Sequence, residues 1–201
     1  MTLQDIFTSK NPKPTYLNAY SSGKPFNLTD SIGYVVSGIV GVVLLNDVDN
    51  PPTIRMLGEG TIINPELIFS PSTGSNRHYV CDSGSSTVVL VKVSVLRGML
   101  DGKTGLDAET RMSLYKELCL ELTAVSAELV ETFNLTPLTV RQRSLVIFER
   151  LQELMGQPCP MTRRRFASYC FTNDLSISKI IKTLKDAKEL PEYAKLLFKL
   201  S

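Results

Sequence analysis

The spacing of apolar and polar residues divides the chain into a β-rich first half and a helical second half. From residue 26 to about residue 103, short runs rich in β-branched residues alternate with turns of Gly, Asn and Pro. Strands are expected within 34–45, at 54–57, at 61–63, at 77–81 and at 87–93. Short strands at such close intervals predict a sandwich or jelly roll.

The longest run of β-branched residues, from Tyr34 to Leu45, contains Ser37 and Gly38. Because strand-forming residues flank this Ser-Gly pair, the run predicts two strands that meet at a corner. Residues 1–25 differ, since they contain three prolines and several small polar residues. They are expected to form a short helix or arm followed by a loop.

Beyond residue 103 the apolar residues change to a helical spacing. Steps of three and four residues follow one another, a repeat typical of a seam shared by two helices. The positions concerned are Tyr115, Leu118, Leu122, Val125 and Leu129. They predict a parallel homodimer joined along this helix. A helix packed on the β domain of its own chain would show a similar stripe, so that alternative stays open.

Thr136 and Pro137 interrupt the helical pattern. A threonine followed by proline favours an N-cap and the first helical position, so a new helix is predicted from here to Leu154. The Gly-Gln-Pro sequence at 156–158 would end it. The joint at 136–137 is therefore the expected hinge between the two halves.

Two shorter helical patterns follow between Met161 and Lys188, with a break at 171–173. Thr162 and Asn173 can each cap one of them, because a side-chain oxygen accepts a hydrogen bond from a first-turn amide. One shared apolar face is formed by Phe166, Cys170, Ile177, Ile180, Ile181 and Leu184. The pattern predicts a helix-turn-helix, whose second helix lies in the major groove of DNA. A helical hairpin without such a function fits the same spacing.

Charge is unevenly distributed, since residues 1–136 carry 10 Lys/Arg and 14 Asp/Glu whereas residues 161–201 carry 9 and 4. A polyanion would be attracted to the C-terminal end. The three consecutive arginines at its start are expected to contact phosphates, and the outward residues of the second helix to approach base edges. The candidate DNA contacts are Arg163, Arg164, Arg165, Asn173, Asp174, Ser178, Lys179 and Lys182. A solvated basic helix face is the alternative.

The composition argues against several other classes of protein. Hydrophobic residues make up 43% and charged residues 21%, as in an ordinary globular protein. The four cysteines are scattered and His78 is the one histidine, which argues against zinc, iron–sulfur and haem sites. No catalytic motif is recognised, so neither an enzyme nor a cofactor is expected. A secretory signal and a membrane-spanning run are not recognised either, and the cytoplasm is the expected location.

The order and spacing of these segments resemble those of Crp/Fnr-type transcription regulators, a bacterial family. The resemblance rests on YVVSGIVGVVLL and LGEGTII in the β half, the long helix, and the pair MTRRRFASYC and TNDLSISKIIKTLK. The last eleven residues, PEYAKLLFKLS, resemble the wing hairpin of that family. The resemblance implies an α+β fold in four parts. They are an N-terminal arm (1–25), a cyclic-nucleotide-binding-like β-roll (26–103), a dimerisation helix (104–135) and a winged helix-turn-helix domain (136–201).

The sequence departs from the family pattern at the nucleotide pocket. Relatives that bind cyclic nucleotides use a Gly-Glu-Leu turn and a downstream Arg-Ser/Thr pair, whereas this chain has Asn-Pro-Glu-Leu at 64–67 and then Arg77. Proline removes a backbone donor and fixes φ, so the phosphate cradle is expected to be damaged. Glu66 and Arg77 would then be remnants of a lost pocket.

The expected recognition helix departs as well. Phe171 stands where many relatives have a turn glycine, and Asp174 and Leu175 stand where they have an Arg-Glu pair. We still expect a homodimeric, sequence-specific DNA-binding regulator that does not depend on cyclic nucleotides. RNA polymerase or another regulator is a further candidate partner. The competing hypothesis, which Asp174 and Leu175 favour, is a protein-interaction module of the same fold that does not read DNA.

Overall fold

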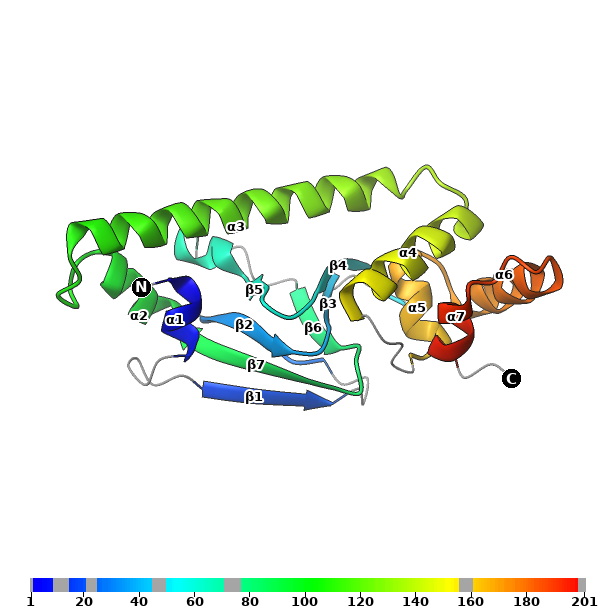
Figure 1. The fold of residues 1–201 in the computed structure, drawn as a ribbon, viewed down its shortest axis with the longest axis horizontal. Helices are drawn as coiled ribbons and strands as arrows, with labels where there is room; N and C mark the ends of the chain where they lie inside the picture. Colours follow the sequence, from blue (N-terminus) through cyan, green and yellow to red (C-terminus); the bar gives the residue numbers. More distant parts are fainter. Residues whose placement is uncertain are drawn as a thin grey trace.

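The computed structural model describes residues 2–8, 15–20, 25–44, 50–70, 77–155 and 161–198. Its strands form two antiparallel sheets (Figure 1). The first sheet has the order β1 (Thr15–Tyr20), β7 (Ser85–Lys92), β2 (Ser31–Ser37) and β5 (Ile62–Ile63). The second has the order β4 (Thr53–Leu57), β3 (Val40–Leu44) and β6 (Arg77–Cys81). Across the described ranges the two sheets remain separate and do not close into a barrel.

Side chains from both sheets meet in one apolar core. Its buried members are Leu28, Val35, Val40, Val42, Leu57, Ile63, Tyr79 and Val88. The chain passes from the first sheet to the second at Gly38, where φ is 84° and an added Cβ would lie 2.4 Å from the carbonyl oxygen of Ser85. Glycine alone fits such a turn without strain. The corner expected at the Ser-Gly pair is confirmed, because β2 and β3 belong to different sheets.

The other face of the first sheet is covered by helices. They are α1 (Leu3–Thr8), the 3-10 helix η1 (Pro65–Ile68), α2 (Val93–Leu100) and the first half of α3 (Ala108–Asn134). Tyr34 and Val89 point into this layer while their neighbours Val35 and Val88 point into the core between the sheets, as the alternation along a strand requires. The loop expected after the N-terminal helix is wrong at 15–20, because β1 pairs with β7 along its whole length. The sequence pattern does not predict α2.

Helix α3 runs along the β-rich part of the molecule, from α2 to the connection that leads into α4 (Figure 1). Asp107 caps its start, since a carboxylate oxygen accepts from the amide of Thr110 at 2.7 Å. A second carboxylate, that of Glu117, accepts from the amide of Leu3 at 2.7 Å and so ties α1 to α3. The first contact is local to the start of α3, and the second holds α3 against α1.

The apolar stripe assigned to a dimer seam faces the chain's own β-roll. Leu118 is 1% exposed and packs in the helical layer over the first sheet, and Val125 is buried as well. Tyr115, Leu122 and Leu129 are half-buried. Packing within one chain, the alternative that the spacing left open, therefore accounts for Leu118 and Val125, and a dimer seam that includes the half-buried positions stays a prediction. The large apolar residues that α3 exposes are Met112, Leu120, Val130 and Phe133.

The described helices of the C-terminal part pack around a core that also includes Ile39 of the β-roll. They are α4 (Val140–Met155), α5 (Arg163–Tyr169), α6 (Asp174–Asp186) and α7 (Glu192–Leu197). The start expected for α4 at residue 137 is wrong. Thr139 and Gln142 form a capping box instead, in which the amide of Thr139 donates to Oε1 of Gln142 at 3.0 Å and the amide of Gln142 donates to Oγ1 of Thr139 at 3.3 Å.

The wing hairpin expected at the C-terminus is also wrong within the described residues, because 192–197 is the helix α7. Tyr193, Ala194 and Leu197 recur at helical spacing and are buried. The Tyr193 hydroxyl donates to the carbonyl oxygen of Leu151 in α4 at 3.1 Å, and the amide of Met161 donates to the carbonyl oxygen of Leu197 at 3.0 Å. The first contact holds α7 against α4, and the second holds it against the residues that precede α5. Residues 199–201 lie outside the described residues.

Candidate nucleic-acid interface

Helices α5 and α6 form a helix-turn-helix with both predicted N-caps in place. Oγ1 of Thr162 accepts from the amide of Arg165 at 3.2 Å, and Oδ1 of Asn173 accepts from the amide of Ser176 at 2.9 Å. The turn between the helices has Phe171 in the left-handed region, at φ 52°. A non-glycine residue there costs about 1–2 kcal/mol. This explains physically why a glycine would be favoured at the same position.

The two faces of α6 differ as the spacing predicts. Ile177, Ile181 and Leu184 are buried in the C-terminal core. The side that faces solvent has Asp174, Leu175, Lys179 and Lys182, with Ser178 half-buried beside them. Leu175 is 71% exposed. The surface that would enter a DNA groove is therefore accessible, with two lysines, one carboxylate and one large apolar side chain.

The three arginines at the start of α5 do not share one environment. Arg163 and Arg164 are exposed, as a phosphate contact requires. Arg165 points the other way and binds Asp82, which follows β6 in the β-roll. Its assignment as a phosphate contact does not hold in this conformation for the edge formed by Nε and Nη2, because that edge binds Asp82.

Asp82, Arg165 and Tyr169 form a group of interactions between the β-roll and the helix-turn-helix, which we call the junction cluster. Nε and Nη2 of Arg165 donate to the two carboxylate oxygens of Asp82 at 2.7 and 2.8 Å. The Tyr169 hydroxyl also donates to this carboxylate. The Asp82 side chain is 0% exposed and that of Arg165 is 19% exposed. The cluster is thus a bidentate, largely buried ion pair.

The surroundings of the junction cluster change the pKa values of Arg165 and Tyr169. Burial lowers the pKa of the Arg165 guanidinium, but the hydrogen bonds and the charge of Asp82 outweigh it and raise the pKa above its ordinary value. Burial and the negative charge of Asp82 raise the pKa of Tyr169. The guanidinium therefore stays charged and the phenol stays protonated, so both remain donors to the carboxylate.

A second group of contacts lies beside the junction cluster. The Ser168 hydroxyl donates to the carbonyl oxygen of Pro51 at 2.5 Å and lies 2.7 Å from the hydroxyl of Thr53. Nδ2 of Asn50 donates to the carbonyl oxygen of Thr172 at 2.8 Å. Residues 165, 168 and 169 occupy one face of α5, because side chains three and four apart are neighbours on a helix. This face of α5 attaches the helix-turn-helix to the β-roll.

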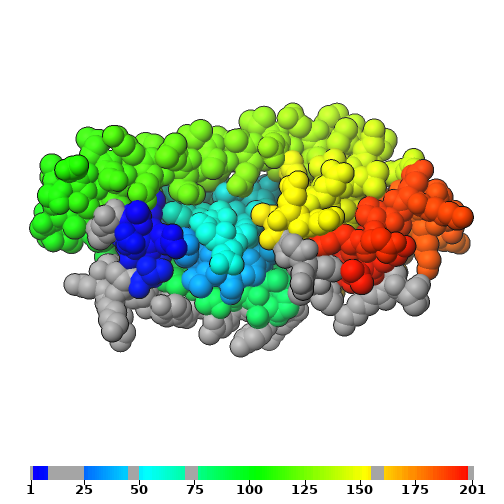
Figure 2. Space-filling view, in the orientation of Figure 1, coloured from blue at the N-terminus to red at the C-terminus, as the bar shows by residue number. Residues whose placement is uncertain are grey.

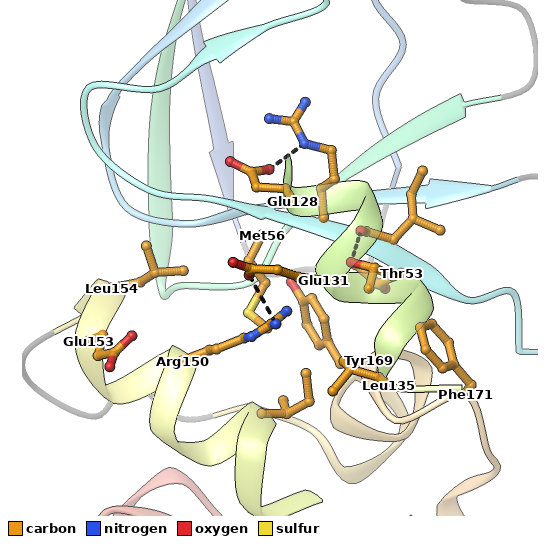
Figure 3. Close-up of a pocket in the computed structure, with 14 residues that line it drawn as sticks. Thr53, Met56, Glu128, Glu131, Leu135, Arg150, Glu153, Leu154, Tyr169 and Phe171 are labelled. Carbon is orange, nitrogen blue, oxygen red and sulfur yellow. Dashed lines mark hydrogen bonds and ion pairs between the residues drawn. The ribbon is translucent and has the colours of Figure 1, made fainter. Parts of the chain in front are cut away.

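A cavity of about 230 Å³ lies between β4, α3, α4 and α5 (Figure 3). Arg150 approaches Glu131 to 3.1 Å on its wall, and the guanidinium of Arg55 lies 2.5 Å from Glu128. Tyr169 lines the cavity too, so the same side chain contacts both the cavity and the junction cluster. Both guanidinium groups are already paired, and the cavity therefore lacks an unpaired cation for an anionic ligand among its described residues.

The two suspected remnants of a nucleotide pocket bind each other. Nη1 of Arg77 donates to Oε1 of Glu66. Next to them, the buried hydroxyl of Tyr79 donates to Oδ1 of Asn64, and burial raises the pKa of Tyr79 to about 12. Asn64 has φ 60° and Pro65 begins η1. Arg77 is thus paired within the chain, although residues 71–76 beside it lie outside the described residues.

Comparison with solved structures supports the resemblance found in the sequence. The global regulator CLP of Xanthomonas campestris, which its description calls responsive to c-di-GMP, superposes with a TM-score of 0.70 at 14% identity, over 88% of this chain and 89% of that one. FixK2 of Bradyrhizobium japonicum gives 0.66 at 16% identity, over 87% and 86%. A CRP-family transcriptional regulator of Thermus thermophilus gives 0.62 at 14% identity, over 87% and 85%.

The chain has the fold of Crp/Fnr-type transcriptional regulators. No protein-family model matches its sequence, and no curated protein does. At these identities the similarity lies in the arrangement of the elements rather than in particular side chains. Among the described residues, no helix is both long enough and apolar enough to span a membrane.

Sequence reasoning missed Asp82, Tyr169 and Gly41 as members of one site. An added Cβ at Gly41, inside β3, would lie 2.3 Å from Oδ2 of Asp82 and 2.7 Å from Nη2 of Arg165. An isolated glycine within a strand often marks a close approach of other groups, so Gly41 is the one signal that could have indicated the junction cluster. Nothing local distinguishes Asp82 from an exposed turn residue.

Proposed function

We propose that this protein is a homodimeric, sequence-specific DNA-binding transcription regulator. The observation that carries the proposal is the accessible outer face of α6, with Lys179 and Lys182, on a capped helix-turn-helix within a Crp/Fnr-type fold. The exposed Arg163 and Arg164 begin the first helix of that motif, where phosphates are approached. We infer no catalytic role, in keeping with the regulators of the same fold. The protein would act in the cytoplasm, with RNA polymerase or another regulator as a further candidate partner.

The proposed dimer uses the outer side of α3. Met112, Cys119, Thr123 and Val130 follow one another at steps of seven, four and seven residues and are exposed, with Leu120 beside them. Figure 2 shows α3 uncovered along one edge of the molecule. A helix of 27 residues is about 40 Å long, which gives two copies room for an extended contact. Exposed apolar residues spaced along such a length favour burial against a second helix.

The proposed regulator does not depend on cyclic nucleotides. Support comes from Pro65, which lacks an amide for a phosphate, and from the pairing of Arg77 with Glu66. To bind here, a nucleotide would have to break this ion pair. The backbone amides of a turn, which could bind the phosphate and offset that cost, are reduced by Pro65.

The test is selection from a random duplex library by the full-length protein, followed by binding to the enriched sequence and to random DNA over a range of salt. A symmetric dimer is expected to enrich a near-palindrome with half-sites about one helical turn apart. Affinity for random DNA should fall as salt rises, because phosphate contacts release counterions. No enrichment and no binding at low salt would contradict the proposal.

One observation favours the second candidate function, a protein-interaction module. Leu175 is 71% exposed at the first turn of α6, beside the carboxylate of Asp174. An apolar side chain in that place suits a protein partner better than a phosphate-rich groove. Leu175→Ala distinguishes the two functions. It would strongly lower the affinity for a protein partner and change the affinity for random DNA little.

A further inference from the structure

We propose that the junction cluster is an autoinhibitory contact in which the carboxylate of Asp82 occupies Arg165 in place of a DNA phosphate. The inference rests on the proposed DNA-binding function and concerns its regulation. In this view the guanidinium has two alternative partners, one within the chain and one on DNA. Binding to DNA then requires that Asp82 give up Arg165.

The chemistry of the two partners is equivalent. A guanidinium donates two parallel hydrogen bonds to a carboxylate or to a phosphate with similar geometry. Arg165 makes such a bidentate contact with Asp82, at 2.7 and 2.8 Å. It follows directly after Arg163 and Arg164, which are exposed on the first turn of α5. The guanidinium therefore belongs to a helix that in this motif crosses the DNA backbone.

The β-roll fixes the backbone of Asp82 independently of Arg165. The amide of Asp82 donates to the carbonyl oxygen of Ile39 at 2.9 Å. The amide of Ile39 donates to the hydroxyl of Ser83 at 2.8 Å, and the Ser86 hydroxyl donates to the carbonyl oxygen of Ile39 at 2.9 Å. These bonds fix the turn that carries Asp82. The backbone position of the acceptor is thus preorganised, which favours its competition with an external anion.

Gly41 supplies the space for the contact. A side chain at this position of β3 would meet the carboxylate at 2.3 Å, the guanidinium at 2.7 Å and the Tyr169 hydroxyl at 2.7 Å. All three members of the junction cluster converge on this one point. A substitution at Gly41 can therefore disturb the cluster through its added volume alone, while the charges of Asp82 and Arg165 are retained.

The expected effect on DNA is uniform across sequences. The contact with Asp82 removes one phosphate contact from every complex, and a charge-assisted hydrogen bond is worth roughly tenfold to a hundredfold in an equilibrium constant. Loss of the contact should therefore raise affinity for random DNA about tenfold or more. The salt dependence should steepen by about one unit for the phosphate contact regained.

The experiment compares Asp82→Asn and Gly41→Ala with Gly98→Ala, a matched control whose added Cβ meets nothing within 4 Å. Hydrogen exchange of the amides at 163–172 reports on the junction without DNA. Titration of random duplex over a range of salt reports on binding. We expect faster exchange and tighter, more salt-dependent binding in the first two variants, and neither change in the control. Adding Arg165→Ala to Asp82→Asn should remove the gain.

Three results would overturn the inference in distinguishable ways. Faster exchange together with unchanged or weaker DNA binding would make Asp82 a purely structural partner of Arg165. Unchanged exchange in both Asp82→Asn and Gly41→Ala would show that the carboxylate does not hold the helix. Absence of DNA binding by the unmodified protein and by every variant at low salt would overturn the proposed function, and this inference with it.

Discussion

The inward and outward sides of α5 differ in the surroundings of their polar side chains. On the inward side, Arg165, Ser168 and Tyr169 all bind groups of the β-roll. On the outward side, Arg163 and Arg164 are exposed to solvent. Residues of the same type, two positions apart, therefore have opposite roles in the fold. The difference teaches that a basic residue in a helix-turn-helix becomes a candidate DNA contact by its direction and not by its charge.

Helix α3 repeats this comparison with apolar residues. Leu118 is buried against the chain's own β-roll, while Leu120 is exposed on the opposite side. The inward side completes the core of one chain, and the outward side is the one that the proposed dimer would use. Both helices thus stabilise the protein with one face and are available for recognition with the other. Substitutions placed on opposite faces test this division.

The largest effect is expected from Leu118→Asp. A buried, unpaired carboxylate costs several kcal/mol, which is comparable with the whole stability of a domain. The variant should fail to show a cooperative thermal transition by circular dichroism. Leu120→Asp, on the exposed side of the same helix, should keep one. A normal transition in Leu118→Asp would contradict the division of α3 into two faces.

The next effect concerns Arg165→Ala, which leaves the buried carboxylate of Asp82 without its cation. Removal of one partner from a buried ion pair destabilises by about 3–5 kcal/mol. Arg163→Ala should change the free energy of unfolding by no more than about 0.5 kcal/mol. Urea titration of both variants gives the two values. Equal values would mean that the two arginines are equivalent after all.

The outer side of α3 gives a third test. Val130→Asp together with Leu120→Asp should weaken self-association by roughly thirtyfold or more, because central apolar contacts contribute most to an interface. Sedimentation should then detect folded monomers. The matched pair Glu109→Ala and Lys116→Ala leaves the apolar residues intact and should preserve the dimer. A folded, dimeric double aspartate variant would place the interface elsewhere.

A smaller effect is expected from Lys179→Ala. It should weaken binding to the preferred site by about 1–3 kcal/mol and change binding to random DNA much less. Arg163→Ala should instead weaken both about equally and reduce the salt slope by about one unit. Parallel titrations of both duplexes distinguish a base contact from a phosphate contact. Equal losses for Lys179→Ala on both duplexes would remove it from the set of base contacts.

The smallest effect is expected from cyclic AMP and cyclic GMP, which should produce no binding heat in calorimetry. The reason is the missing amide at Pro65 and the pairing of Arg77 with Glu66. Arg77→Ala should leave this result unchanged. Low-micromolar binding that disappears in Arg77→Ala would show that the pocket still functions.

Much of the secondary structure could be predicted because it depends on neighbours in the sequence. The strand at 77–81 and both caps of the helix-turn-helix follow from propensity and from hydrogen bonds that span three residues. The buried face of α6 follows from its helical period. The start of α4 was misplaced because two capping signals, at 136 and 139, compete within four residues. The reciprocal hydrogen bonds between Thr139 and Gln142 favour the second.

The sequence by itself determined most of the strands between 34 and 93, the helices α3, α5 and α6, and that the C-terminal part is basic. Only the tertiary structure decided that 15–20 is a strand, which face of α3 is buried, that the C-terminal segment is a helix, and that Arg165 points toward the β-roll. The physical reason is the distance along the sequence between the residues that interact. A period or a cap is set by residues a few positions apart, whereas Arg165 is oriented by Asp82, 83 positions earlier in the chain. No local sequence pattern can predict a contact between residues that are so far apart in the chain.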